Sequence, residues 1–163
     1  MELFFQVLAG LLAAVAMSFA LAHAAELPGK MRLGQEQYFI VQSIYYPGFT
    51  IGGIFEAASI LATLVLLLLT PVETTAFWLV AGALAAVAVM QLVFWLVTQP
   101  VNKLWLKDAK LSGSARRFFE TGASEIDPAA DWTVLRDRWE RSHVLRAVAS
   151  MLALILLLIA IAL

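Results

Sequence analysis

The sequence has no cysteine and few charged residues. None of its 163 residues is Cys, and 14% are Asp, Glu, Lys or Arg. Without thiols, the chain offers neither disulfide bonds nor thiolate ligands for a metal ion. Its net charge of −1 gives no reason to expect a nucleic acid partner. Stability and chemistry therefore depend on apolar burial and on a small set of polar side chains.

Long uncharged segments make up most of the chain. Hydrophobic residues account for 62% of it, and four uncharged runs can each be extended to about 20 residues, enough to cross a bilayer. Backbone polar groups in lipid must be satisfied within the segment, which favours helices. We predict an all-α, integral membrane four-helix bundle that forms a single domain over residues 1–163. The four helices are expected at residues 3–25, about 38–70, 74–98 and 131–163.

Proline marks the expected ends and interruptions of these helices. Pro28 is expected to stop the first helix near Leu27. Pro47 and Gly48 predict a kink at residues 47–48, or a break into an amphipathic lead-in and a span. Gln99–Asn102 is expected to end the third helix. A cytoplasmic loop is predicted over 99–131, with short amphipathic helices at 101–111 and 114–120.

The fourth helix is expected to pass from water into lipid. Asp131 is a candidate N-cap, because its carboxylate can accept from N–H groups of the first turn. The next twenty residues alternate charged and apolar side chains, and the segment after Ser150 is entirely apolar. One continuous helix from 131 to 163 is the simplest prediction.

The positive charges predict the topology. All eleven Lys and Arg residues lie in two stretches: Lys30 and Arg32, then nine residues between Lys103 and Arg146. Because basic connections stay in the cytoplasm, both termini are expected outside. The predicted location is the inner (plasma) membrane, as a multi-pass protein surrounded by the lipid bilayer.

A polar and aromatic stripe runs along the second helix. Its members recur every three or four residues, which places them on one helical face. Glu56 belongs to this stripe. An ionisable residue inside a span is costly, so it should face the protein interior and have a partner. The stripe consists of Tyr38, Gln42, Tyr45, Phe49, Gly52, Glu56, Ser59 and Thr63.

The other helices have polar residues at the same depth. With the predicted topology, the first helix brings His23 and Glu26 to the cytoplasmic half of the bundle. The third helix has a face formed by Gln91, Trp95, Thr98 and Asn102, and the fourth has one formed by Trp132, Arg136, Trp139, His143, Arg146 and Ser150. We expect these faces to meet around a shared polar site.

Several interpretations of this site remain open. It could be a structural network in which Glu56 pairs with Arg146 or His143. It could hold one non-haem metal ion through His23, His143, and Glu26 or Glu56. His23 and His143 could instead bind haem. The fourth interpretation is a pocket without a cofactor, where His143 or Glu56 acts as a base on an organic substrate.

Aromatic residues suggest the kind of molecule that such a pocket would accept. A flat apolar pocket open to the cytoplasmic leaflet would suit a hydrophobic small molecule. Tryptophan and tyrosine also gather at membrane surfaces whatever the function. The candidate lining residues are Tyr38, Gln42, Tyr45, Trp95 and Trp139.

These motifs, taken together, resemble a known family. The relevant elements are His23-Ala-Ala-Glu26-Leu-Pro28-Gly-Lys30, Gln42 with Tyr45-Tyr46, Pro100-Val101-Asn102, and Trp132-x-x-Leu135-x-x-x-Trp139-x-x-x-His143-x-x-Arg146. The chain resembles the small four-helix membrane proteins that include the anthrone oxygenases of aromatic polyketide pathways. The resemblance implies a four-helix membrane fold and, for some members, oxygenation of an activated aromatic C–H without an established metal or flavin.

Two hypotheses of function follow. In the first, the protein is an oxygenase-like or other redox enzyme for a hydrophobic aromatic or quinone-like molecule. His143 would orient or deprotonate the substrate, Arg146 and Asn102 would stabilise oxyanion charge, and Glu56 would tune His143 or shuttle a proton. In the second, the chain is a non-catalytic subunit or scaffold of a larger membrane complex. A homo-oligomer is compatible with either hypothesis.

Overall fold

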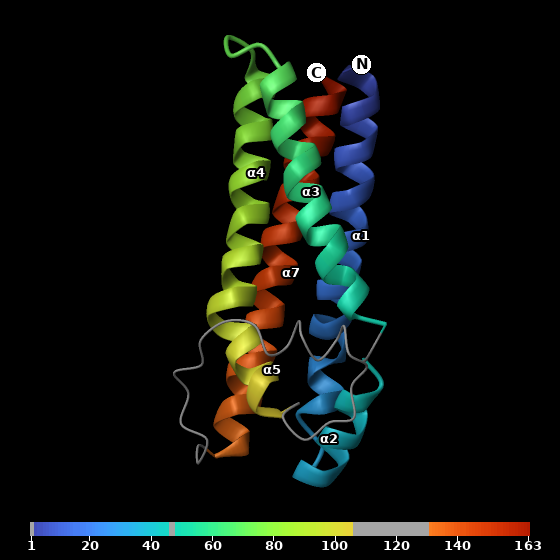
Figure 1. Cartoon of the computed structure of the whole chain (residues 1–163), viewed down its shortest axis with the longest axis vertical. Helices are drawn as coiled ribbons and strands as arrows, with labels where there is room; N and C mark the ends of the chain where they lie inside the picture. The colour runs from blue at the N-terminus through green and yellow to red at the C-terminus, as the bar shows by residue number, and fades with distance from the viewer. Residues whose placement is uncertain (1, 46–47, 106–130) are drawn as a thin grey trace.

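Four long helices run side by side along the whole molecule, and both termini lie at the same end (Figure 1). The computed structural model describes residues 2–45, 48–105 and 131–163. Within those ranges all regular secondary structure is helical. Four helices are long and apolar enough to cross a membrane, which confirms the predicted four-helix fold and makes the chain a multi-pass membrane protein. These spans are α1 (Glu2–Lys30), α3 (Thr50–Leu69), the segment that starts with α4 (Thr75–Val93), and α7 (Trp132–Ala162).

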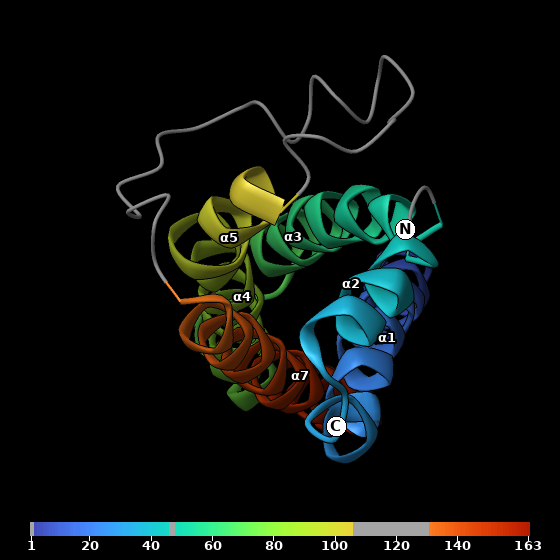
Figure 2. The same ribbon diagram turned by 90° about the horizontal axis from the view of Figure 1, so that it is seen from below.

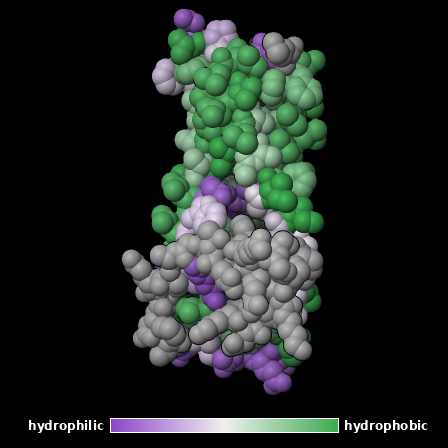
Figure 3. Space-filling model, viewed as in Figure 1, coloured by the Kyte–Doolittle hydropathy of each residue, from purple (hydrophilic) through white to green (hydrophobic). Residues whose placement is uncertain are grey.

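The helices form a ring in the order α1, α7, α4, α3, with each helix packed against its two neighbours (Figure 2). Small residues make this close packing possible, since alanine lets helix backbones approach one another. On α1 they recur every three or four residues, at Ala9, Ala13, Ala16 and Ala20, and all four are buried. Many other large apolar side chains are exposed, and the surface in Figure 3 is mainly hydrophobic over its upper half.

The first helix continues past the expected stop near Leu27 and ends at Lys30, with Pro28 inside its last turn. The Met31 N–H still donates to the Leu27 carbonyl at 3.0 Å, so helical bonding resumes after the proline. A tertiary contact explains the extra turn: Lys30 Nζ lies 3.0 Å from Glu140 Oε2 on α7. The prediction of a helix end near Leu27 was wrong because it considered local preference alone.

The second predicted helix is broken rather than kinked. A short helix, α2 (Gln35–Ser43), lies at the end of the bundle opposite the termini, and α3 begins only at Thr50 (Figure 1). Residues 46–47 lie outside the described part of the chain. The alternative of a separate amphipathic lead-in is therefore the one that forms, and it buries Tyr38 and Gln42.

The third span does not end at Gln99–Asn102. A π-helical segment, η1 (Phe94–Thr98), follows α4 and leads directly into α5 (Gln99–Trp105), which contains Pro100. Proline removes the N–H that would bond to the carbonyl four residues earlier. That carbonyl, Leu96 O, accepts instead from Arg138 Nη2 at 3.4 Å. The helix therefore continues as far as Trp105, and the short amphipathic helices predicted beyond it fall in residues 106–130, outside the described ranges.

The N-cap predicted for the last helix is confirmed. Asp131 Oδ1 accepts from the Thr133 backbone N–H at 2.7 Å and from the Thr133 hydroxyl at 2.7 Å. These hydrogen bonds lower the pKa of Asp131. From this cap α7 runs without interruption to Ala162.

Replacing Asp131 with Ala is expected to lower the thermal midpoint by about 2–4 °C, because one N-cap is lost from a chain of this size. Asp131→Asn, which can also cap a helix, should be close to wild type. Folding lowers the pKa of Asp131. The stability that its carboxylate contributes is therefore present above the ordinary carboxyl pKa, and it is lost as the pH falls through the pKa of the folded state. Thermal unfolding in one detergent at several pH values measures this difference. An equal loss for the Ala and Asn variants would contradict the capping role.

Candidate active site

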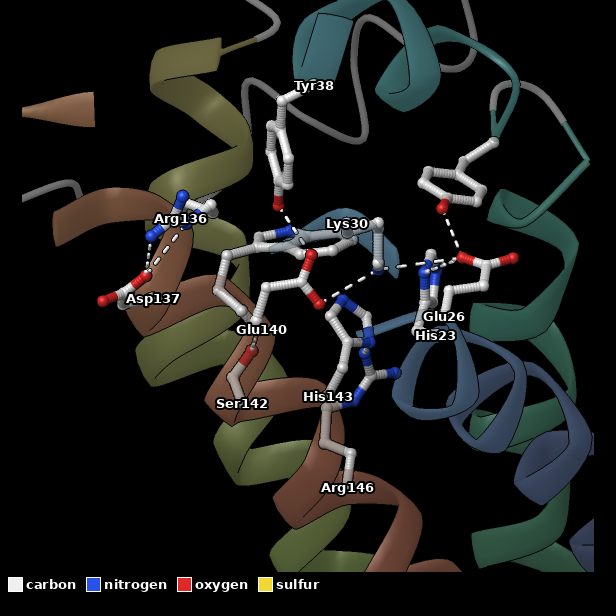
Figure 4. Close-up of polar contacts among 12 residues, drawn as sticks. His23, Glu26, Lys30, Tyr38, Arg136, Asp137, Glu140, Ser142, His143 and Arg146 are labelled. Atoms are coloured by element: carbon white, nitrogen blue, oxygen red, sulfur yellow. Dashed lines mark hydrogen bonds and ion pairs between the residues drawn. The ribbon is translucent and has the colours of Figure 1, made fainter. Parts of the chain in front are cut away.

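A cluster of buried polar side chains lies in the half of the bundle opposite the termini. His23 comes from α1, Glu56 from α3, and His143 and Arg146 from α7. All four are at most 5% exposed, and all four line one cavity together with Asn102 of α5. The predicted convergence of these polar faces is therefore what the fold produces. Figure 4 shows the α1 and α7 side of this cluster.

Glu56 and Arg146 form a buried ion pair between α3 and α7. Glu56 Oε1 accepts from Arg146 Nη2. With its amide oriented to satisfy both neighbours, Gln91 of α4 donates to Glu56 Oε2 at 2.9 Å and accepts from Trp95 Nε1 at 2.8 Å. Both carboxylate oxygens are thus engaged. A buried charge is tolerated when it is paired and hydrogen-bonded in this way.

The two histidine rings are in direct contact, with centroids 4.1 Å apart. Arg146 Nη1 lies 3.2 Å from His143 Nδ1. Because a guanidinium can only donate, Nδ1 accepts and the ring proton of neutral His143 lies on Nε2. Within the part of the chain that the structure describes, His143 Nε2 and His23 Nδ1 are both buried without a hydrogen-bond partner. The site therefore has two imidazoles with unused hydrogen-bonding capacity.

The cavity has a volume of about 60 Å³. Water needs roughly 10–15 Å³ measured in the same way, whereas a cavity that holds benzene is about 150 Å³. In this conformation the cavity therefore has room for a few small molecules but not for an aromatic ring. Aromatic and small residues complete its wall, namely Phe19, Ala20, Tyr45, Phe49, Thr50, Gly52, Gly53, Phe94, Thr98 and Trp139.

A second buried charge cluster lies beside the first, toward α2. Lys30 Nζ is 3.0 Å from Glu140 Oε2 and 3.7 Å from Glu26 Oε2, and Figure 4 shows it between the two carboxylates. Tyr38 donates to Glu140 Oε1 at 2.7 Å, and Tyr45 donates to Glu26. Burial and the adjacent Glu140 carboxylate raise the pKa of Tyr38, so its phenol stays protonated and donates. Tyr38 thus attaches α2 to α7, and Tyr45, just after the end of α2, attaches the chain to α1.

Hydrogen bonds also join α5 and η1 to α7. Trp139 Nε1 donates to Asn102 Oδ1 at 2.8 Å, and the hydroxyls of Thr98 and Ser142 are 2.8 Å apart. The side-chain oxygen of Asn102 therefore orients Trp139, and the NH₂ group of Asn102 is the part of its amide that can donate to a ligand. Asn102, Thr98 and Trp139 all line the cavity.

Not every predicted pocket residue reaches the cavity. Tyr45 and Trp139 line it, whereas Tyr38, Gln42 and Trp95 do not. The positions of Tyr38 and Gln42 are explained by the helix bounds: α2 ends at Ser43 and α3 begins at Thr50, so the stripe does not extend along one straight helix. Trp95 lies in η1, is 37% exposed, and directs its indole N–H to Gln91. The π-helical turn alters the helical register at this point, which the 3.6-residue periodicity did not anticipate.

The ligand sets predicted for metal and haem are not assembled. Among residues 2–45, 48–105 and 131–163, no group of three His, Cys, Asp or Glu side chains is placed to hold a metal ion. Glu56 pairs with Arg146, and Glu26 is occupied by Tyr45 and Lys30. The contact between His23 and His143 leaves no room for a porphyrin plane between the rings. In this geometry the residues do not fit either cofactor.

The sequence analysis did not predict the buried ion pair between Lys30 and Glu140 or the two phenylalanines that line the cavity. Lys30 was noted as a topology signal and as part of the family motif, and Glu140 received no role, yet both are at most 3% exposed. Their separation of 110 positions in sequence left no local pattern to detect. Phe19 and Phe94 also line the cavity. Phe19 lies four residues before His23, one helical turn away on the same face, so periodicity could have identified its position.

Gly52 allows α1 and α3 to approach at the cavity. A Cβ at this position would lie 3.1 Å from Phe19 Cγ, and Phe19 already packs edge-on against Phe49. Gly52→Ala is therefore expected to destabilise the protein by about 1–3 kcal/mol through overpacking. Gly10→Ala is the matched control, because its Cβ would meet only Ile161 at 3.9 Å. Thermal unfolding of both variants measures the difference, and equal midpoints would contradict the tight packing of Phe19.

The fold and the site define a class: a four-helix membrane protein with a buried polar cavity between its helices. The family model described as Anthrone oxygenase matches residues 42–156. The chain therefore belongs to the anthrone oxygenase family, in agreement with the resemblance of its motifs. No curated protein matches the chain, and no solved structure does either.

Proposed function

We propose that the protein is a membrane oxygenase for a hydrophobic aromatic molecule with an acidic C–H, such as an anthrone. The reaction converts a CH₂ group between two aromatic rings and O₂ into a ketone and water. A base removes one proton, and the resulting carbanion, delocalised as a phenolate, gives its electrons to O₂. The peroxide that forms at this carbon then loses water to leave the carbonyl. All electrons come from the substrate, so no external reductant is required.

One observation supports this proposal above the others: the two imidazoles contact each other at the cavity and have unused nitrogen atoms. A base must have a free lone pair within reach of the proton that it removes. His143 accepts from Arg146 through Nδ1, so its remaining Nε2–H is a donor. We therefore assign the base to His23, in place of the role first considered for His143.

The remaining polar groups suit the stabilisation of an oxyanion. His143 Nε2–H and the Asn102 amide are donors at the cavity wall, and Arg146 supplies positive charge. Preorganised donors in a site that excludes water stabilise developing negative charge more strongly than water does. Glu56 acts as a positioning residue, because its ion pair orients the Arg146 guanidinium. Substrate entry requires the ring side chains of Phe19 and Phe49 to move, since the cavity is smaller than one benzene ring.

Oxygen uptake by the purified protein tests this function. The protein in lipid nanodiscs is mixed with anthrone and no reductant, while an oxygen electrode and quinone absorbance follow the reaction. We expect one O₂ consumed per quinone formed, at a rate well above autoxidation in empty nanodiscs. A rate equal to autoxidation would overturn the proposal. The satisfied ion pairs of Glu56 and Lys30 would then favour the scaffold hypothesis, in which these contacts serve only to hold the helices together.

Sidedness is part of the same proposal. Because basic connections stay in the cytoplasm, we propose that Lys30, Arg32 and the segment from Lys103 to Arg146 lie on the cytoplasmic side of the plasma membrane. A reporter enzyme that is active only outside the cell is expected to be active when fused after Leu163 and inactive when inserted after Arg32. The reverse pattern would contradict the predicted orientation.

A further inference from the structure

A groove runs along the outside of the bundle where α7 lies beside η1. Its volume is about 480 Å³. Val93 and Val97 form one wall, and the other wall consists of α7 residues that follow one another at helical spacing. The α7 residues that face the cavity lie on the other side of the helix, so the groove is separate from the candidate active site. The α7 wall consists of Val134, Asp137, Arg138, Arg141, Ser142 and Leu145.

The groove has an excess of positive charge. Arg138 and Arg141 are both exposed on α7. Among the described residues that line the groove, Asp137 is the one carboxylate. It accepts from Arg136 Nε at 2.9 Å and from Arg136 Nη2 at 2.8 Å, so its charge is already compensated. Arg138 makes one long contact, 3.4 Å to the Leu96 carbonyl. Two guanidinium groups that line the same groove are suited to bind a phosphate, because each offers a planar pair of donors.

Exposed apolar side chains follow the groove along α7. On the same face of α7, Leu145, Val148 and Leu152 are 50%, 60% and 50% exposed. They follow Arg138 and Arg141 at spacings of three and four residues, so they form one stripe along the helix. On α4, Leu92 is exposed at 56%. Cationic groups at one end and an apolar stripe beyond them match the shape and polarity of a phospholipid.

We propose that this groove binds an anionic phospholipid. The phosphate contacts Arg138 and Arg141, and an acyl chain lies along Leu145, Val148 and Leu152. Basic residues at the membrane surface attract anionic lipids, and each contributes roughly a five-fold gain in binding. The uncharged stripe excludes a purely soluble phosphate compound as the preferred occupant, because such a compound leaves the apolar part of the groove empty.

Native mass spectrometry tests this site. The protein is purified in a neutral detergent and titrated with phosphatidylglycerol, with phosphatidylcholine that has the same acyl chains, or with soluble glycerol phosphate. Wild type is expected to bind phosphatidylglycerol at least about ten-fold more tightly than phosphatidylcholine. Arg138→Gln and Arg141→Gln should each weaken phosphatidylglycerol binding about five-fold. Arg32→Gln is the control, because it removes an exposed positive charge outside the groove.

Three results would overturn the proposal: phosphatidylcholine binding as tightly as phosphatidylglycerol, full competition by glycerol phosphate, or groove variants that match Arg32→Gln. Arg141→Lys keeps the positive charge but loses the planar pair of guanidinium donors. It is expected to retain part of the preference for phosphatidylglycerol over phosphatidylcholine. The anthrone assay is independent of this result, so failure of the lipid site leaves the proposed enzyme function intact.

Discussion

Replacing Arg146 with Ala is expected to lower the free energy of unfolding by about 3–5 kcal/mol, because it leaves a carboxylate buried without its cation. Glu56 is 3% exposed, and its remaining neighbour is the Gln91 amide. An amide donor compensates a buried negative charge less well than a guanidinium does. The same change also removes the donor to His143 Nδ1. Thermal and chemical unfolding in a single neutral detergent measures the loss.

Two further variants separate the burial of an unpaired charge from other effects. The double change Glu56→Leu with Arg146→Met removes both charges, and it should recover most of the stability because neither partner is left alone. Arg141→Ala removes an exposed arginine from the same helix, and its effect should stay within about 0.5 kcal/mol. Arg146→Ala within 1 kcal/mol of wild type would show that Glu56 does not depend on this partner.

His23→Gln is expected to reduce the rate of anthrone oxidation by about 10²–10⁴-fold, the usual contribution of a general base. The reason is the tautomer: His143 Nδ1 is occupied by Arg146, so His23 is the imidazole with a lone pair available. His143→Gln keeps a side-chain N–H and should lose less activity than His143→Leu, which removes the donor completely. Initial rates at saturating substrate, with a CD₂ form of the substrate as a second probe, test this ranking.

The isotope effect distinguishes a base from a structural residue. If His23 removes the proton, deuteration should slow the wild-type reaction, and added imidazole should partly restore activity to His23→Gly. A purely structural His23 would give a loss of stability without rescue. If His143→Gln loses more activity than His23→Gln, the two roles are reversed. Unchanged rates in both variants would exclude the imidazole pair from the reaction.

Much of the bundle and the centre of the site could be predicted from the sequence. Hydropathy identified four spans, because a bilayer requires about 20 apolar residues per helix. The cost of a charge in lipid predicted that Glu56 would face inward and find a partner, and Arg146 is that partner. Helical spacing likewise placed His143 and Arg146 on one face. These predictions depend on periodicity and solvation, which are properties of the chain itself.

The helix ends and several pocket residues could not be predicted in this way. Pro28 and Pro100 both lie inside helices that contact α7. Lys30, two residues after Pro28, pairs with Glu140, and the Leu96 carbonyl that Pro100 leaves without its helical donor accepts from Arg138. Trp95 was expected in the pocket but lies after the start of a π-helical segment. The periodicity of the sequence does not show where a π-helical turn inserts an extra residue, because the stability of such a turn depends on the side chains that pack beside it.

The class of protein, the number of spans and the polar faces that had to meet follow from the amino-acid sequence. The atoms that pair between helices follow from how the helices pack: Lys30 with Glu140, Arg146 with Glu56, and His23 against His143. The partners in each of these pairs are far apart along the chain. Burial preferences act on each helix alone, whereas a specific ion pair or ring contact depends on how two helices rotate and slide against each other as their side chains pack.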